Sequence, residues 1–509
     1  MGSQLHPILS DAPRGVTARF RYQQSIPSAR WLDPHEIKQS TLFSYDPYNP
    51  GGKILVGAID DTLIGIEDDR HILTVAGSRA GKSVSMIGNL LLYRGSVLAT
   101  DPKAELANIT ARRRANLGQK VYVLDPFGYT DPAIADLRAS YNPLSVLTPD
   151  SPTIIEDAGL IAEAIVIQPA DQKEPHWDES AKNLIEGIIL HVATDGAYEG
   201  ARDIVTVREL IKTAMMVEEP EDEDTTPLCV RERAMLEQAV TLQDSPRTFD
   251  LGAAIEGAAR GFYELEAREQ ANVLSNVRRH TKFLDYSAMR RTLRGHDFDL
   301  ADLKRAPKGV SVYLCFPATR VAMSNRWLRI FINQLLDAME REKTQPAAPV
   351  LACLDEFPVL GYMRQLEAAA GQISAFGVKL WVVIQDWGQG KTLYQDRWET
   401  FVGNAGVLQF FGNNDLATTE YISRRLGKTP VEVTRRGDVG ADQSQRGQTG
   451  QQQVSELHDL LAADEVARLF ARSDPKKRQL VIWAGYHPMV LQRVEYFDQD
   501  GPLGKMLRE

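Results

Sequence analysis

Short apolar runs alternate with segments of helical spacing along the first part of the chain. The runs lie at 54–57, 72–76, 96–100 and 121–124. In the segments between them, apolar residues recur every three or four positions, which is typical of amphipathic helices. Short apolar strands that alternate with helices indicate parallel strands joined by crossover helices, so we expect an α/β fold.

The alternation stops near residue 141, and helical spacing dominates from there to residue 300. One helix in this region carries a single apolar stripe, made of Trp177, Ala181, Leu184, Ile185, Ile188, Ile189 and Val192. Strand-like runs then resume at 310–316, 350–354, 379–384, 406–411 and 479–484. The later runs would complete the sheet begun by the earlier ones, so we expect an all-helical domain inserted into a discontinuous α/β domain.

These patterns divide the chain into an arm and two domains. Residues 1–52 are rich in Pro, Tyr and Ser and predict an extended, turn-rich arm. The α/β domain has a first part at 53–148 and a second part at 301–509, and the inserted all-helical domain occupies 149–300. The polar, Gly- and Gln-rich segment near 435–457 predicts a mobile loop.

Composition narrows the class of protein. With 509 residues, 43% of them hydrophobic and 25% charged, the chain is long enough for two or three packed domains. No apolar run is long enough for a membrane helix, and the N-terminus lacks the build of a signal peptide, so we expect a soluble chain. Cys315 and Cys353 lie inside apolar runs, which indicates core thiols in a reducing cytosol. The net charge of −10 argues against binding nucleic acid by overall attraction, although a local basic strip would suffice.

The stretch AGSRAGKS at 76–83 matches the spacing of a phosphate-binding loop, with alanine at the usual first glycine. A strand-like run precedes it and a helical segment follows, an arrangement that points backbone N–H groups at a phosphate. Lys82 is then expected to reach the β- and γ-phosphates, and Ser83 to ligate Mg²⁺. The alternative is an ordinary glycine turn. The candidate nucleotide-binding residues are Ala76, Gly77, Ser78, Arg79, Ala80, Gly81, Lys82 and Ser83.

Polar residues follow three other apolar runs. Asp355 and Glu356 come after the run at 350–354, where we expect Asp355 to hold Mg²⁺ at the end of a neighbouring strand and Glu356 to take a proton from the attacking water. Gln385 ends the next strand and is either a contact to the γ-phosphate or water, or a surface residue. Residues 101–103 (Asp-Pro-Lys) also lie at a strand end, where α/β sheets bind ligands.

With these motifs, the chain resembles the TraG/TraD-type coupling proteins of type IV secretion and conjugation systems, which are ring-forming motor ATPases related to FtsK and HerA. The resemblance covers nearly all of the chain. It is carried by an ordered set of motifs: SARW at 28–31, AGSRAGKS at 76–83, GSVLATDPKAEL at 95–106, GQKVYVLDPFG at 118–128, YNPL at 141–144, WDESAKNLIEGIIL at 177–190, LDEFPVLG at 354–361, FGVKLWVVIQD at 376–386 and TTEYISRRLGKTPV at 418–431.

The resemblance implies a RecA-like P-loop NTPase domain with an inserted all-α domain, ATP and Mg²⁺ as cofactors, and catalytic roles for Lys82, Asp355, Glu356 and Gln385. It also implies a homo-hexamer at the cytoplasmic side of the bacterial inner membrane. Its partners there would be secretion-channel and inner-membrane proteins, together with a relaxase and single-stranded DNA or protein effectors as cargo.

Two features depart from the family pattern. Members usually begin with membrane-spanning helices, which this chain lacks, so we expect either a trimmed chain or a variant that another protein tethers. Some relatives place an arginine eleven residues before the strand-end glutamine, where it acts on a neighbour's nucleotide; here that position is Ser374. Arg364, Arg424 or Arg425 would replace it, or are ordinary surface residues.

Two functions remain open at this point. The first is a motor ATPase that drives DNA translocation, for which the basic clusters at 111–120 and 277–294 would contact phosphate backbones or be solvated helix faces. The second is a nucleotide-dependent substrate receptor with little motor activity, in which the acidic segment 218–224 recruits protein effectors. The long insertion and the Asp-Glu couple disfavour a small-molecule kinase.

Overall fold

A mixed β-sheet forms the centre of the computed structural model, which describes residues 29–167, 176–217, 228–436 and 451–508. Within these residues the sheet has 11 strands in the order β2-β1-β13-β12-β9-β3-β8-β7-β4-β6-β5. Its strands are β1 (Ile54–Ile59), β2 (Thr62–Ile66), β3 (His71–Ala76), β4 (Val97–Asp101), β5 (Lys120–Leu124), β6 (Val310–Cys315), β7 (Val350–Leu354), β8 (Val378–Ile384), β9 (Ala405–Phe411), β12 (Arg478–Trp483) and β13 (Met489–Gln492).

The strands from β9 to β5 in this order are parallel, and β12, β13, β1 and β2 extend the sheet antiparallel. Every strand-like run expected from the sequence lies in this sheet, so the predicted α/β fold is confirmed. β2 and β13 were not predicted. Both are short hairpin partners, β2 of β1 and β13 of β12, and this pairing fixes them rather than a pattern of their own.

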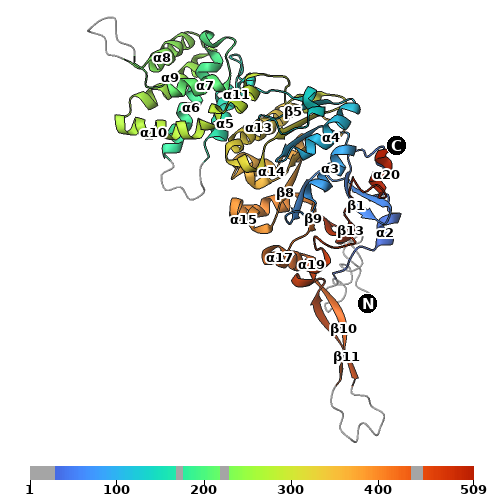
Figure 1. The fold of residues 1–509 in the computed structure, drawn as a ribbon. Coiled ribbons are helices and arrows are strands. Elements are labelled where there is room, and N and C mark those ends of the chain that lie inside the picture. Colours follow the sequence, from blue (N-terminus) through green and yellow to red (C-terminus); the bar gives the residue numbers. More distant parts are fainter. Residues whose placement is uncertain (1–28, 168–175, 218–227, 437–450, 509) are drawn as a thin grey trace, which may run out of the picture.

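Helices cover both faces of the sheet, because side chains along a strand point alternately to its two faces. In β3, Leu73 and Val75 pack on one face with α13, whereas Ile72 packs on the other face with α3 and α4. Figure 1 shows α13 on one side of the sheet and α3 and α4 on the other. The helices of this domain are α2 (Pro34–Gln39), α3 (Lys82–Leu92), α4 (Glu105–Asn116), α12 (Asp302–Arg305), α13 (Val321–Arg341), α14 (Arg364–Ala370), α15 (Trp387–Tyr394), α16 (Trp398–Gly403), α17 (Leu416–Leu426), α19 (Ala463–Leu469) and α20 (Pro502–Arg508).

The region between β5 and β6 is helical and lies at one end of the sheet (Figure 1). The predicted apolar stripe lies on α6, where Ala181, Leu184, Ile185, Ile188, Ile189 and Val192 are buried and Trp177 is half-buried. The helices are α5 (Ile154–Ile165), α6 (His176–Thr194), α7 (Ile204–Lys212), α8 (Val230–Gln243), α9 (Phe249–Tyr263), α10 (Ala267–Thr281) and α11 (Ser287–Arg294). This order is compatible with the predicted domain limits, which stay a prediction.

Two arginines of α13 join this helical region to the sheet. Arg329 is buried and donates hydrogen bonds to the carbonyl oxygens of Ala164 and Leu360, each at 3.0 Å. Arg326 donates to the carbonyl oxygen of Ile165 at 3.0 Å and to Nδ1 of His280 at 3.1 Å. Guanidinium groups that donate to helix-end carbonyl oxygens in this way help to fix the geometry of the junction.

Two segments differ from the expected structure. Residues 29–52 of the predicted arm pack on the sheet, because Ile37 and Phe43 are buried and the Gly65 N–H donates to the Phe43 carbonyl oxygen at 2.9 Å. The predicted loop at 435–457 is partly strand: β10 (Lys428–Arg436) and β11 (Gln451–Asp459) form a two-stranded ribbon that projects from the body (Figure 1).

The alternation of Val431 and Val433 with polar residues favours this ribbon, and its cross-strand pairing overrides the Gln-rich composition. The rest of that loop, the acidic segment 218–224 and the first 28 residues lie outside the described residues. Among the described helices, none is both long enough and apolar enough to span a bilayer.

Replacing His71 with glutamine is expected to change how the unfolding free energy depends on pH. The His71 ring is buried, accepts from the Leu380 N–H at 3.2 Å and contacts the Ala370 carbonyl oxygen at 2.8 Å, and its burial lowers its pKa from 6.5 to about 4. Protonation below pH 6.5 therefore favours the unfolded chain, and the wild-type protein should lose about 2 kcal/mol of stability relative to His71→Gln between pH 7 and 5.

Urea unfolding of both proteins at the two pH values measures this difference, and the titration of all other groups cancels between them. A difference in unfolding free energy that does not change with pH would contradict a neutral, buried imidazole.

Candidate functional site

The predicted phosphate-binding loop is a tight turn between β3 and α3. Gly77 donates its N–H to the Phe411 carbonyl oxygen at 3.2 Å, and a Cβ atom at Gly77 would lie only 2.0 Å from the Gly412 carbonyl oxygen. Gly81 has φ +101°, a conformation that favours glycine, and Lys82 is the first residue of α3. The two glycines therefore let the chain turn closely enough for the α3 N-terminus to face the cavity beside it.

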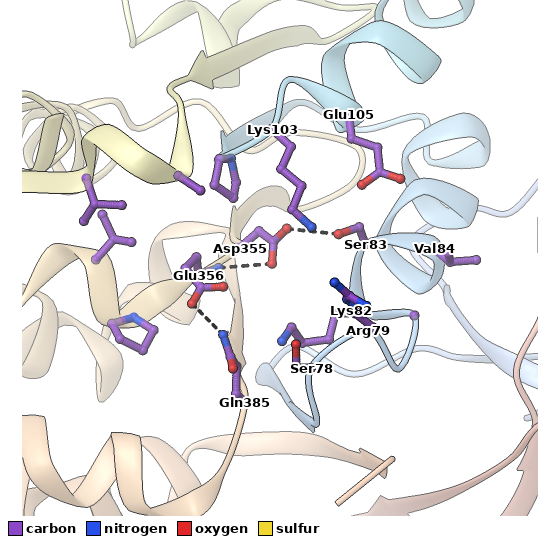
Figure 2. A pocket seen from close by; sticks show the side chains of 16 residues that line it. Ser78, Arg79, Lys82, Ser83, Val84, Lys103, Glu105, Asp355, Glu356 and Gln385 are labelled. Atoms are coloured by element: carbon purple, nitrogen blue, oxygen red, sulfur yellow. Dashed lines mark hydrogen bonds between the residues drawn. The ribbon is translucent and has the colours of Figure 1, made fainter. Parts of the chain in front are cut away.

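That cavity has a volume of about 700 Å³ and lies at the carboxyl ends of the parallel strands (Figure 2). Five of the eight predicted loop residues line it: Ser78, Arg79, Gly81, Lys82 and Ser83. Ala76, Gly77 and Ala80 are not among the lining residues. Ala76 and Ala80 are buried, and all three contribute to the site through the backbone of the turn.

The predicted acidic couple and glutamine line the same cavity. The Ser83 hydroxyl donates to Asp355 Oδ2 at 3.3 Å, and the Glu356 N–H donates to Asp355 Oδ1 at 3.0 Å. Gln385 Nε2 donates to Glu356 Oε1 at 2.9 Å (Figure 2). The structure thus brings together Lys82, Ser83, Asp355, Glu356 and Gln385, which are widely separated in the sequence.

One part of the prediction is wrong. Asp355 was expected at the end of the strand beside the loop strand, but β8 lies between β3 and β7. Gln385 follows β8 and therefore stands between the phosphate-binding loop and the acidic couple. β8 follows β7 in the sequence and lies between β7 and β3 in the sheet. A local apolar pattern does not specify this order of strands.

Burial and neighbouring charges set the electrostatics of the site. Burial, followed by repulsion from Glu356, raises the pKa of Asp355 to about 6, although Lys82 opposes this shift. Burial lowers the pKa of Lys82, whereas Glu356 and Asp355 favour its charged form. Burial disfavours the charged form of Asp355, and a bound cation would favour that carboxylate form again.

Glu356 has a strained backbone with φ +56° and ψ 48°, the left-handed region that non-glycine residues seldom adopt. Its carbonyl oxygen accepts the Val359 N–H at 2.9 Å, and its carboxylate is held by Gln385. Strained residues of this kind persist where the surrounding contacts over-determine them, and they are frequent at functional sites. Here the strained residue lines the cavity.

Sequence reasoning missed Arg493, which follows β13. Its guanidinium donates to the Ala80 carbonyl oxygen inside the phosphate-binding loop and lies 5.2 Å from the centre of the Phe411 ring. Arg493 is half-buried, and this burial lowers its pKa. No local pattern marks it, because its contact to the loop spans 413 positions and depends on the antiparallel extension of the sheet.

The two basic clusters differ in how many of their side chains are engaged within the chain. In the first, Arg114 is fully buried and donates to the Leu90, Tyr93 and Gly95 carbonyl oxygens, and Arg112 pairs with Asp136.

In the second cluster, Arg290 pairs with Glu209 at 2.6 Å, and the exposed Arg278 donates to the Lys212 carbonyl oxygen. Lys282, Arg291 and Arg294 are exposed as well. Arg364, Arg424 and Arg425 are not among the residues that line the cavity in this chain.

A strand, a tight glycine loop and a helix that starts with Lys-Ser, facing an acidic couple across the carboxyl edge of a mainly parallel sheet, define a P-loop NTPase fold. The particular family follows from the sequence: the chain belongs to the family described as "Type IV secretory system Conjugative DNA transfer", which matches residues 22–507. The predicted family is therefore confirmed.

Similar curated proteins carry corresponding names. The chain is 26% identical to a conjugal transfer protein TraG of Escherichia coli over 79% of its length, and it spans 65% of that relative. A second TraG of Escherichia coli is 25% identical over 93% of the chain and 76% of the relative. A type IV secretion system-coupling protein VirD4 of Bartonella quintana is 24% identical over 84% of the chain and 63% of the relative.

Solved structures of the bacterial conjugative coupling protein TrwB share the fold. The trigonal form in complex with sulphate has a TM-score of 0.62 at 15% identity, covering 92% of this chain and 94% of that chain. TrwB in complex with ADP and Mg²⁺ has a TM-score of 0.62 at 14% identity, covering 94% of this chain and 96% of that chain. The predicted RecA-like P-loop fold with its helical insertion is thus confirmed.

The variant Gly77→Ala is expected to lower the unfolding free energy by about 1–3 kcal/mol, because its Cβ would force the loop away from Gly412. Gly257→Ala is a matched control: it lies in α9, and nothing lies within 4 Å of a Cβ added there. The control should be about 0.5–1 kcal/mol more stable than wild type, because alanine favours a helix. Equal stability of Gly77→Ala and wild type in urea unfolding would contradict the close approach.

Proposed function

We propose that the chain is the Mg²⁺-dependent coupling ATPase of a type IV secretion or conjugation system, which recruits DNA-relaxase or protein substrates and drives their transfer by ATP hydrolysis. The observation that carries the proposal is the convergence of Lys82, Ser83, Asp355 and Glu356 on one cavity. Membership of the conjugative DNA transfer family supports the biological setting. The chain spans about two thirds of the length of the TraG relatives, so activity, cargo and partners are proposed for it.

The donor set fits a magnesium ion. The Ser83 hydroxyl and the Asp355 carboxylate are hard oxygen ligands that already lie 3.3 Å apart, and they would hold Mg²⁺ together with phosphate oxygens and water. Bound there, the ion would neutralise charge on the terminal phosphates. TrwB has been solved with a non-hydrolysable ATP analogue and with ADP and Mg²⁺, which supports both cofactors here.

The side chains that line the cavity would then have different roles in hydrolysis. Lys82 and the N–H groups of the loop would bind the phosphates, and Glu356 would accept the proton of the attacking water. Gln385 donates to Glu356 Oε1, so it would orient that carboxylate toward the water. The strained Glu356 backbone pre-organises the base before the nucleotide binds, which lowers the cost of reaching the reactive geometry.

The proposed assembly is a homo-hexameric ring at the cytoplasmic side of the bacterial inner membrane, in contact with secretion-channel and inner-membrane proteins. The opening of the cavity at the edge of the sheet would allow a neighbour to supply an arginine, for which Arg364, Arg424 and Arg425 are the candidates. The inserted helical domain at 149–300 would then receive the cargo, and residues 53–148 and 301–509 would form the motor.

A second candidate is a nucleotide-dependent receptor or scaffold with little motor activity. The first basic cluster favours it, because Arg114 is buried and Arg112 is paired with Asp136. The net charge of −10 points the same way.

ATP turnover of a concentrated, DNA-supplemented sample distinguishes the two functions. Glu356→Gln is expected to lower turnover by roughly 10²–10⁴-fold while nucleotide still binds, because only the base is lost. Lys82→Ala is expected to lose both binding and turnover, because the lysine neutralises phosphate charge in both states. Wild-type turnover no higher than that of Lys82→Ala would contradict the motor and favour the scaffold.

A further inference from the structure

The turn between β4 and α4 presents a second lysine to the cavity. Asp101 ends β4, Glu105 begins α4, and the Lys103 side chain between them lines the cavity that Lys82 enters from the opposite side (Figure 2). The proposed function gives no role to Lys103.

The carboxylate of Asp101 holds this turn. Asp101 is buried and accepts the Ala107 N–H at 2.8 Å and the Lys103 N–H at 3.4 Å. Its own side chain therefore faces the protein interior, where it closes the first turn of α4. The Asp101 carboxylate thus accepts hydrogen bonds from the backbone of the turn, whereas the Lys103 side chain faces the cavity.

The backbone of the turn is fixed from the β6 side as well. The Asp101 and Pro102 carbonyl oxygens accept the N–H groups of Phe316 and Ala318, at 3.1 and 3.0 Å. Ala104 is fully buried and has φ +56°, a strained conformation for alanine. The turn is therefore strained and held by hydrogen bonds from two sides. Backbone strain of this kind is frequent at ligand sites.

Lys103 forms no ion pair with Glu105, Asp355 or Glu356, the acidic residues that line the cavity with it. Among the described residues, no carboxylate lies within 4.0 Å of its ammonium group, and the nearby Lys103 charge is one of the causes that lower the pKa of Lys82. Two ammonium groups that repel each other across one cavity favour a ligand with several negative charges. Asp355 and Glu356 do not cancel this positive charge once a divalent cation is bound, because the cation neutralises the Asp355 carboxylate.

The order of the strands indicates which part of the ligand Lys103 would contact. Along the carboxyl edge lie β3 with the phosphate-binding loop, β8 with Gln385, β7 with the acidic couple, and β4 with Lys103. We expect a phosphate chain whose first groups lie on the loop to place its last phosphate beside Ser83 and Asp355, the proposed metal ligands. The last phosphate is therefore the group nearest to Lys103.

We propose that Lys103 binds the terminal phosphate of a nucleoside triphosphate and thereby makes the site prefer triphosphate over diphosphate. This role rests on the proposed function of the cavity and adds a residue that distinguishes the nucleotide before hydrolysis from the product. Loss of the terminal phosphate removes the partner of Lys103 and leaves the contacts of the loop in place.

The test is the affinity of the full chain for two fluorescent nucleotides with Mg²⁺, a non-hydrolysable ATP analogue and ADP. Lys103→Ala should weaken binding of the ATP analogue about tenfold and change ADP binding by less than about twofold, because a charge-assisted contact to one phosphate is lost. Lys103→Arg should restore most of the preference, since it keeps the charge. Lys120→Ala, an exposed lysine at the start of β5 and the opposite edge of the sheet, is the matched control and should leave both affinities unchanged.

The outcomes separate the two proposals. If wild type binds both nucleotides and Lys103→Ala weakens both equally or neither, the role of Lys103 is overturned and the proposed function stands. If wild type binds no nucleotide, both are overturned. Because Lys103 is exposed, its substitution should not change the thermal unfolding temperature, and an unchanged temperature with lost ATP-analogue preference supports the proposal.

Discussion

The contact between Ser83 and Asp355 is the constraint on which the site depends. These two residues lie 272 positions apart, and their hydrogen bond exists only because β3, β8 and β7 are parallel and end at one edge of the sheet. In the observed register Val75 pairs with Ile384, so the loop and Gln385 leave the sheet at the same level. A shift of one residue in either pairing would turn these side chains to the opposite face and remove the metal ligands.

The elements around this edge link it to the rest of the molecule. The first residue of α13, Val321, lines the cavity, and the same helix carries Arg326 and Arg329 into the helical region. On the other side, Arg493 ties the phosphate-binding loop to the antiparallel strands at the C-terminal end of the chain. The cavity is therefore in direct contact, through single helices or side chains, with both flanking parts of the described structure.

The sequence was sufficient where the signal is local. Apolar strands such as 350–354, the stripe on α6 and the loop at 76–83 carry their own patterns, because burial and tight turns restrict residue type directly. It was insufficient where pairing decides the structure. β2, β13 and the β10–β11 ribbon are short or polar strands, the position of β8 between β3 and β7 is a matter of topology, and Arg493 acts through a contact to Ala80. Residues 29–52 lack periodicity yet pack, since three large side chains, Ile37, Phe43 and Tyr45, are buried in the core on this side of the sheet.

The most direct test of the account is a structure of the protein with Mg²⁺ and a non-hydrolysable ATP analogue. The account predicts one metal ion about 2.1 Å from Ser83 Oγ, within the coordination shell oriented by Asp355, and Lys82 Nζ on the phosphates. Nucleotide bound away from the β3–α3 loop, or a metal ion that touches neither Ser83 nor the shell of Asp355, would contradict it.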